Sequence, residues 1–345
     1  MKKVLAAVLG AAMVVSSFAL LASCGESKIY IDGKFNKEAS AEEIESLKTT
    51  VRGFSSSYAG DTSASDWSYG LHMITKGKND MQMSMSVGEN SMNLTANTDA
   101  NIDMNFSMAK AGDKLDYAYG GKFDFNFNLS NFAESGQSQT AMKGNIYGNA
   151  ADLYFDGSID ASFGQDSGIN LSGKYKFGVD GVLGEAIDEA LSTMLSGTTL
   201  EMESPAENVK SFIDEMFAFS GAKVYIDDSD AAETKVKFSI DGAAYLQSSF
   251  SGDSMITTDV VADIVSSMDF KTVDYYLSFN KTTGMVTGYG GVFDVELKDF
   301  SLNLGSEETM AFSMNMSMDV DYSSWVLLSD ESVIAPDDIS EYIAA

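Results

Sequence analysis

The chain has 345 residues, of which 51 are acidic and 22 basic, and its formal net charge is −29. Phosphate binding depends on clustered lysine and arginine, so this charge excludes a nucleic-acid partner. A chain of this length can bury a large core. With one cysteine it forms no internal disulfide, and two prolines leave no Pro-rich linker, which favours one continuous domain.

The first 24 residues are built like a bacterial export signal. Two lysines precede an apolar stretch, residues 4–20, that is too short to predict a transmembrane span. Leu21-Ala22-Ser23-Cys24 follows and resembles the lipobox of bacterial lipoproteins. The resemblance implies a signal peptide over 1–23, a palmitate-bearing anchor on Cys24, and an extracytoplasmic protein held at the cell membrane or the outer membrane. An ordinary secretory signal with an incidental cysteine is the alternative.

Residues 24–39 are polar and predict a flexible tether. Ser40 and Glu43 then form a capping box, in which each residue bonds the backbone of the other. Four apolar residues follow at spacings of three, four and three, namely Ile44, Leu47, Val51 and Phe54. The pattern predicts an amphipathic helix over 41–57.

From residue 67 to about 179 the apolar period changes to two. Met81, Met83 and Met85 alternate with polar residues, and so do the apolar residues of 92–96, 102–108 and 123–129. Side chains on a strand point alternately to opposite faces, so the pattern predicts antiparallel strands with one dry and one wet face. Short glycine-containing turns between the runs favour a meander.

Helical periods return in the middle of the chain. They predict helices over 182–196 and 205–219, the second with Pro205 at its first position, and a short helix over 258–268. Strands are expected at 224–226, 236–240 and 245–250, and again from 273 to about 322. Residues 40–330 thus form a single β-rich domain, and 331–345 form a C-terminal tail with a helical turn near 336–343.

This order of elements resembles the half-barrel lipoproteins of the LolA-like superfamily. The strand–turn–strand unit of residues 273–286, with its Thr283-Gly284 turn, carries the resemblance at the level of residues. The fold class predicted is α+β, mainly antiparallel β: a large curved sheet or half-barrel meander with a few amphipathic helices on its concave face. The resemblance implies acyl-chain binding between the sheet and the helices.

The dry face supplies the candidate site, because methionine is unbranched and repacks around apolar ligands. We expect an apolar cavity lined by Met81, Met83, Met85, Met104, Phe106, Phe125, Phe127, Leu183, Phe212, Met216, Met314 and Met316. The alternative is a plain filled core. In that case the chain is a surface or structural lipoprotein that meets another protein.

Catalysis and metal binding find little support in the sequence. His72 is the sole histidine, on a strand where we expect it to face solvent, so a histidine triad or a multi-histidine zinc site is excluded. The Met-x-Met-x-Met run could bind cuprous ion, but these residues share the core face. We expect no enzyme, metal or cofactor, and as partners the membrane, a lipid ligand or a protein.

Overall fold

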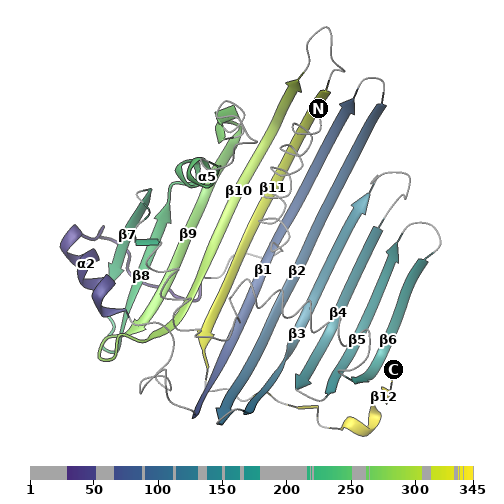
Figure 1. Ribbon diagram of the computed structural model, residues 1–345, viewed down its shortest axis with the longest axis horizontal. Helices are drawn as coiled ribbons and strands as arrows, with labels where there is room; N and C mark the ends of the chain where they lie inside the picture. Colours follow the sequence, from purple (N-terminus) through teal and green to yellow (C-terminus); the bar gives the residue numbers. More distant parts are fainter. Residues whose placement is uncertain are drawn as a thin grey trace.

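The computed structural model describes residues 29–51, 66–87, 90–111, 114–130, 138–149, 152–163, 167–178, 216–217, 219, 221–250, 262–263, 265–304, 312–329, 333, 335–336 and 338–344. Within these residues the chain forms one open 12-stranded sheet with two α-helices, α2 and α5 (Figure 1). None of the described helices is both long and apolar enough to cross a membrane.

Two antiparallel meanders build this sheet. The first runs through β1 to β6 and the second through β7 to β11, and the pairing of β1 with β11 joins them into the order β12-β6-β5-β4-β3-β2-β1-β11-β10-β9-β8-β7. The strands are β1 Asp66–Val87, β2 Asn90–Ala111, β3 Lys114–Ser130, β4 Ser138–Asn149, β5 Asp152–Phe163, β6 Ser167–Gly178, β7 Ala222–Asp227, β8 Glu233–Ile240, β9 Met268–Asn280, β10 Val286–Leu304, β11 Phe312–Leu328 and β12 Ile343–Ala344. The predicted antiparallel, mainly β architecture is confirmed.

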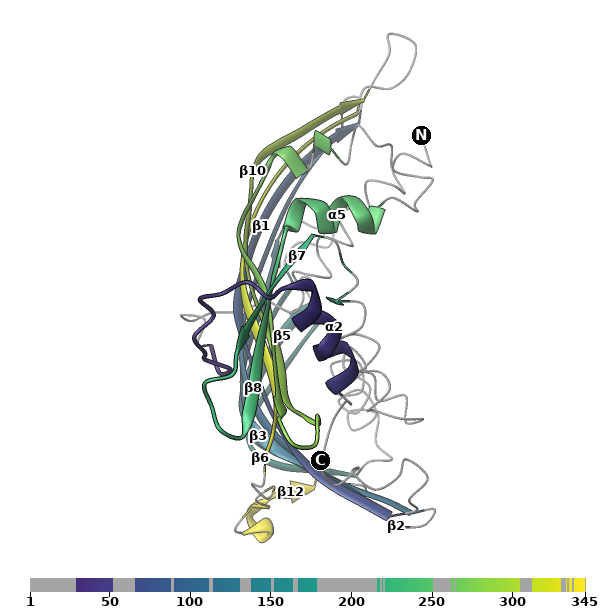
Figure 2. The same ribbon diagram turned by 90° about the vertical axis from the view of Figure 1, so that its left-hand side faces the viewer.

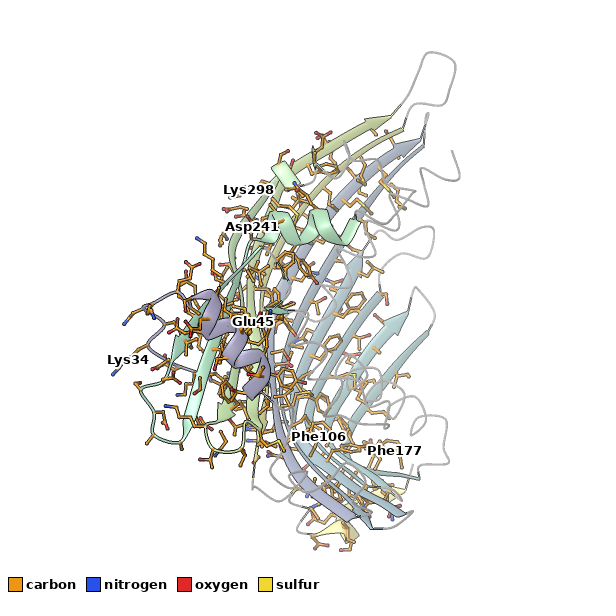
Figure 3. All side chains as sticks on the ribbon, turned by 60° about the vertical axis from the view of Figure 1, so that its left-hand side comes forward. Lys34, Glu45, Phe106, Phe177, Asp241 and Lys298 are labelled. Atoms are coloured by element: carbon orange, nitrogen blue, oxygen red, sulfur yellow. The ribbon has the colours of Figure 1, made fainter. Side chains whose placement is uncertain are left out.

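The sheet is curved, and both helices lie on its concave side (Figure 2). Alternation along the strands sends the apolar side chains to that side, where they form the main core. Leu47 and Val51 of α2 pack into it, together with Phe106 of β2 and Phe238 of β8. In Figure 3 the side chains of Phe106 on β2 and Phe177 on β6 both lie over the lower half of the sheet, away from Lys34.

The convex side also carries an apolar patch, which the sequence did not predict. Ile74, Tyr276, Val292 and Trp325 form this convex patch, and Ile31 from the N-terminal segment covers it. Trp325 is 0 % exposed there. Residues 29–39 therefore pack on the sheet, where a flexible tether was expected.

Hydrogen bonds fix the N-terminal segment to β7, an edge strand of the sheet. The backbone N–H of Lys34 donates to Asp227 Oδ2 at 2.6 Å, and Glu38 forms a bridge with Tyr225. Backbone N–H groups of Lys34 and Ser229 lower the pKa of Asp227 to about 2, because they stabilise its ionised form.

Helix α2, Ala41–Thr50, has the predicted capping box but is shorter than the predicted 41–57. The N–H of Ser40 donates to Glu43 Oε2 at 2.7 Å, and the N–H of Glu43 donates to Ser40 Oγ at 3.3 Å. This hydrogen bond from the Ser40 backbone, with help from Lys37, lowers the pKa of Glu43 to about 2. Val51 has extended backbone and ends the helix.

The predicted strand at 245–250 is wrong. Residues Gly242–Phe250 form α5, and the Asp241 carboxylate accepts a hydrogen bond from the N–H of Ala244 at 3.0 Å. An aspartate at this position caps a helix, and this local bond outweighs the β-propensity of Tyr245 and Phe250.

The other predicted helices fall mainly outside the described residues. Of 205–219, only 216, 217 and 219 are described, with Met216 and Phe217 helical and buried, and 182–196 is not described at all. Only parts of the predicted helix over 258–268 are described, with helical residues at 262–263 and 265–266 before β9 begins at Met268.

The C-terminal tail belongs to the sheet. A 3-10 turn, Ile339–Glu341, lies within the predicted 336–343, and β12 then pairs parallel to β6 through Ile343 and Tyr175. The tail therefore extends the folded unit beyond residue 330.

Candidate functional site

The structure divides the predicted cavity-lining residues between two apolar clusters. Met104, Phe106 and Met216 belong to the main core. A second group, the methionine cluster, consists of Met81, Met83, Leu94, Ala96, Leu297, Phe300, Met314, Met316, Met318 and Val320, with Met85 packed against it. Phe125 and Phe127 are half-buried on β3, whereas Leu183, Phe212 and Cys24 lie outside the described residues.

Cross-strand pairing explains why the methionines meet. Met81, Met83 and Met85 of β1 lie opposite Met318, Met316 and Met314 of β11. Methionine therefore faces methionine at three neighbouring cross-strand pairs on this face of the sheet. Met81, Met83, Met314, Met316 and Met318 are only 4–7 % exposed. They form a continuous, deformable apolar surface across the centre of the sheet.

A buried polar residue separates the two clusters. Asn79 belongs to the same face of β1 as Met81, opposite Thr98 of β2 and Val320 of β11. Asn79 is 4 % exposed, and its Oδ1 atom has no hydrogen-bond partner within the part of the chain that the structure describes. Buried acceptors are nearly always bonded, so this atom marks a position where an incoming donor would be favoured.

His72 lies on the convex, polar face of β1, as predicted, and is partly exposed. Its Nε2 atom is 2.7 Å from Asp103 Oδ1 of β2. Among the described residues, no three His, Cys, Asp or Glu side chains group as metal ligands do. The structure thus gives the sole histidine a local polar partner on the sheet surface.

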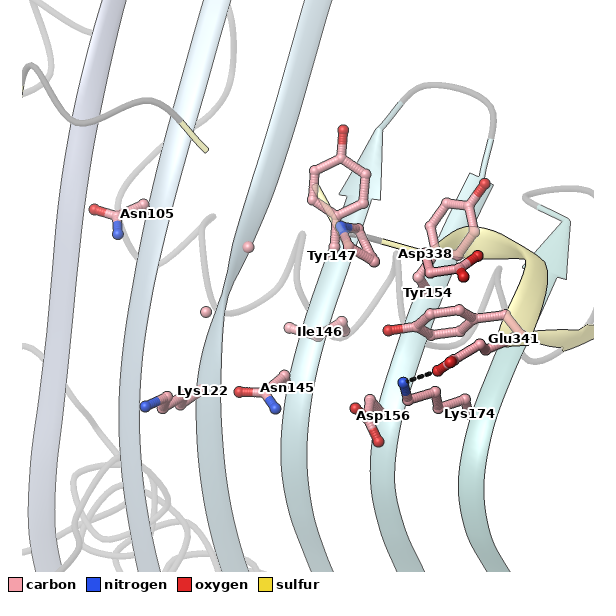
Figure 4. Close-up of a pocket in the computed structure, with 14 residues that line it drawn as sticks. Asn105, Lys122, Asn145, Ile146, Tyr147, Tyr154, Asp156, Lys174, Asp338 and Glu341 are labelled. Atoms are coloured by element: carbon pink, nitrogen blue, oxygen red, sulfur yellow. Dashed lines mark hydrogen bonds and ion pairs between the residues drawn. The ribbon is translucent and has the colours of Figure 1, made fainter. Parts of the chain in front are cut away.

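A hollow of about 870 Å³ lies on the convex face, where β3 to β6 meet the C-terminal segment. We call it the convex hollow. Its lining is Asn105, Gly120, Gly121, Lys122, Asn145, Ile146, Tyr147, Tyr154, Asp156, Lys174, Pro336, Asp338, Glu341 and Tyr342 (Figure 4). Apart from Ile146, which belongs to the main core, the lining side chains come from the polar face of the sheet and from the C-terminal segment, so the hollow is distinct from the predicted apolar cavity.

Contacts of the C-terminal segment hold one wall of the hollow in place. Glu341 forms an ion pair with Lys174, and this hydrogen bond raises the lysine pKa. The ring of Tyr342 meets Tyr154 edge-on, with centroids 5.3 Å apart. Burial, with the negative charge of Asp156, raises the pKa of Tyr342, so its hydroxyl remains a donor at neutral pH.

Glycine forms the floor of the hollow. A Cβ atom on Gly120 would lie 3.1 Å from Val333 Cγ1 and 3.4 Å from the Tyr147 ring. A larger side chain at position 120 would therefore press against Val333 and the Tyr147 ring. Sequence reasoning missed this site, because its polar residues are spread over five strands, β2 to β6. The C-terminal segment, which is distant in sequence, forms the wall that makes them a site.

Comparisons with known proteins identify no relative. No family model and no curated protein matches the chain. Among solved structures, a DUF1329 family protein from Desulfovibrio piger is similar at a TM-score of 0.15 and 7 % identity, covering 87 % of this chain and 97 % of that one. The translocator domain of the autotransporter NalP from Neisseria meningitidis gives 0.15 and 9 %, covering 81 % and 93 %. A FadL homologue from Pseudomonas aeruginosa gives 0.12 and 7 %, covering 75 % and 90 %. TM-scores this low establish neither a shared fold nor a function.

Proposed function

We propose that this protein is an extracytoplasmic lipoprotein that binds an amphiphile on the concave face of its sheet. The acyl chain lies along the methionine cluster, and the polar group of the amphiphile donates a hydrogen bond to Asn79. The observation that carries the proposal is the buried Oδ1 atom of Asn79, which lacks a partner between two apolar clusters.

Energetics favour this use of the face. An acyl chain placed on buried apolar surface contributes about 0.8 kcal/mol for each methylene group removed from water. A ligand donor bonded to Asn79 Oδ1 would remove the free-energy cost of a buried acceptor that lacks a hydrogen bond. Methionines at the three β1–β11 pairs can change rotamer to admit chains of different length.

The ligand test is mass spectrometry of protein purified without detergent, followed by titration with a fluorescent fatty acid. We expect co-purified lipid and saturable binding, weakened in Asn79→Leu. The matched control, Asn93→Leu, changes an exposed asparagine on the next strand. Absence of both lipid and fatty-acid binding would reject the proposal.

A second candidate is a closed-core surface lipoprotein that binds another protein. The low exposure of the methionine cluster favours it, since methionines that fill their own space leave none for a ligand. Under this alternative the purified protein carries no lipid, and fatty-acid titrations show no binding to the unchanged protein or to Asn79→Leu.

The proposed anchor is a diacylglycerol on Cys24. Two or three acyl chains hold a protein at a bilayer almost permanently, whereas one does not. We expect metabolic labelling with a palmitate analogue, and we expect Cys24→Ala to abolish the label and release the protein from the membrane fraction. Labelling that persists in the variant would remove the anchor from the proposal.

We propose a binding role without catalysis. The only histidine, His72, pairs with Asp103 on the convex face, on the opposite side of the sheet from the methionine cluster. Turnover of a bound lipid by the purified protein, measured as released fatty acid, would contradict this part of the proposal.

A further inference from the structure

The convex hollow has the size of a ligand site and an unusual supply of unused polar groups. Its volume, about 870 Å³, is within the range of small-molecule sites. Asn105 Oδ1 is buried and has no hydrogen-bond partner among the described residues. In the part of the chain that the structure describes, Lys122 and Asn145 also make no hydrogen bond or ion pair.

The free groups include donors and acceptors side by side. An asparagine amide both donates and accepts, the Lys122 ammonium only donates, and an ionised Asp156 only accepts. Figure 4 shows Lys122, Asn145 and Asp156 in one row across neighbouring strands, and Asn105 lies above this row on the strand beside Lys122. A ligand that matches them must itself donate and accept at closely spaced positions, as hydroxyl groups do.

The charges of the hollow largely cancel. Lys174 and Glu341 form an ion pair, and the Asp338 carboxylate accepts a hydrogen bond from the N–H of Ser340 at 3.0 Å. Lys122 and Asp156 have opposite formal charges, so the two lysines and three carboxylates of the lining leave a formal charge of −1, on Asp338. A phosphate or a sulfate would therefore meet carboxylates, and a cation would meet ammonium groups, so the lining favours a neutral ligand.

Aromatic rings complete the lining. The Tyr147 and Tyr154 rings lie with centroids 5.9 Å apart, and Tyr342 stands edge-on to Tyr154. Tyrosine offers an apolar ring face and a polar hydroxyl at the rim of a site. Sugar rings have the complementary chemistry, with C–H faces that pack on aromatic rings and hydroxyl groups around the edge.

We propose that the convex hollow binds a neutral oligosaccharide. Asn105 and Asn145 recognise its hydroxyl groups, and Tyr147 packs against a sugar ring. The site is separate from the concave face, so it binds independently of any amphiphile.

The test is isothermal titration of the full folded chain with maltohexaose, cellohexaose, mannohexaose and N-acetylchitohexaose. We expect at least one to bind, and Asn105→Ala and Asn145→Ala each to weaken binding about three- to tenfold, as for one lost hydrogen bond. Asn101→Ala is the matched control, because Asn101 is exposed on the same face of β2 and does not line the hollow. The control should bind like the unchanged protein.

Three results would overturn the proposal. They are no binding of any of the four sugars at millimolar concentration, equal binding by the two hollow variants and the unchanged protein, and stronger binding of polygalacturonate than of the neutral sugars. Asn145 is exposed, so its alanine variant folds even if Asn105→Ala does not, and it keeps the test decisive.

Discussion

Replacement of Asn79 by leucine separates stability from binding. The Asn79 side chain is buried between Thr98 and Val320 on the neighbouring strands, and its Oδ1 atom has no partner among the described residues. A buried acceptor left unbonded costs about 1–3 kcal/mol, and an apolar group of similar shape does not carry this penalty. Asn79→Leu should therefore raise the free energy of unfolding of the ligand-free protein by about 1–3 kcal/mol.

The same substitution should weaken amphiphile binding. The proposed hydrogen bond to Oδ1 contributes about 0.5–1.5 kcal/mol, which corresponds to roughly a three- to tenfold change in the dissociation constant. Fatty-acid titration measures this change. Stability is measured by urea unfolding, with the fluorescence of the fully buried Trp325 as a reporter.

Two results would refute the reasoning. A destabilised Asn79→Leu protein would mean that the amide makes a structural bond, and a more stable protein with unchanged binding would mean that no ligand reaches Asn79. Asn93→Leu, at an exposed position, should alter the unfolding free energy by no more than about 0.5 kcal/mol.

Two further substitutions test the packing of the main core and the attachment of residues 29–39 to the sheet. Phe238 is 2 % exposed, and its ring meets the Phe217 ring edge-on, with centroids 5.0 Å apart. Phe238→Ala should lower the free energy of unfolding, measured in urea, by about 3–5 kcal/mol. A loss below about 1 kcal/mol would show that the site is loosely packed. The Asp227 pKa is lowered to about 2 in the folded protein, so its stabilising effect is complete above the unfolded value near 3.8 and is lost as pH falls through about 2. Asp227→Asn should flatten the stability profile between pH 4 and 2, and an unchanged profile would mean that the bond to Lys34 does not hold the segment.

Alternating patterns predicted the strands well because one face of this sheet is dry. Met81, Met83 and Met85 repeat every second residue, and β1 extends through them. Alternation cannot say which distant strands pair, so the β1–β11 contact and the strand order came only from the structure. Helix α5 was missed because aromatic residues outweighed the capping signal of Asp241.

Local exceptions to the alternation indicate where both faces of the sheet are covered, which the sequence analysis did not predict. Ile74 follows Met73, and Val326 follows Trp325, so both faces of the sheet are apolar at these points. Adjacent buried residues on a strand predict cover on both sides. For the candidate site, the methionines were found from sequence, whereas Asn79 was missed because a single polar residue within a strand gives no sign of its unpartnered atom.

Packing of the N-terminal segment on the convex face limits how the molecule can stand at a membrane. Four residues lie between Cys24 and Ile29, the first described residue, and the five Cα-to-Cα steps span at most about 18 Å. If Cys24 carries the acyl chains, Ile29 stays within this distance of the lipid headgroups, and the neighbouring Tyr30 ring lies against Trp325 of β11. The molecule then has little freedom to tumble, and an amphiphile leaving the bilayer must travel around the edge of the sheet to reach the methionines on the far side.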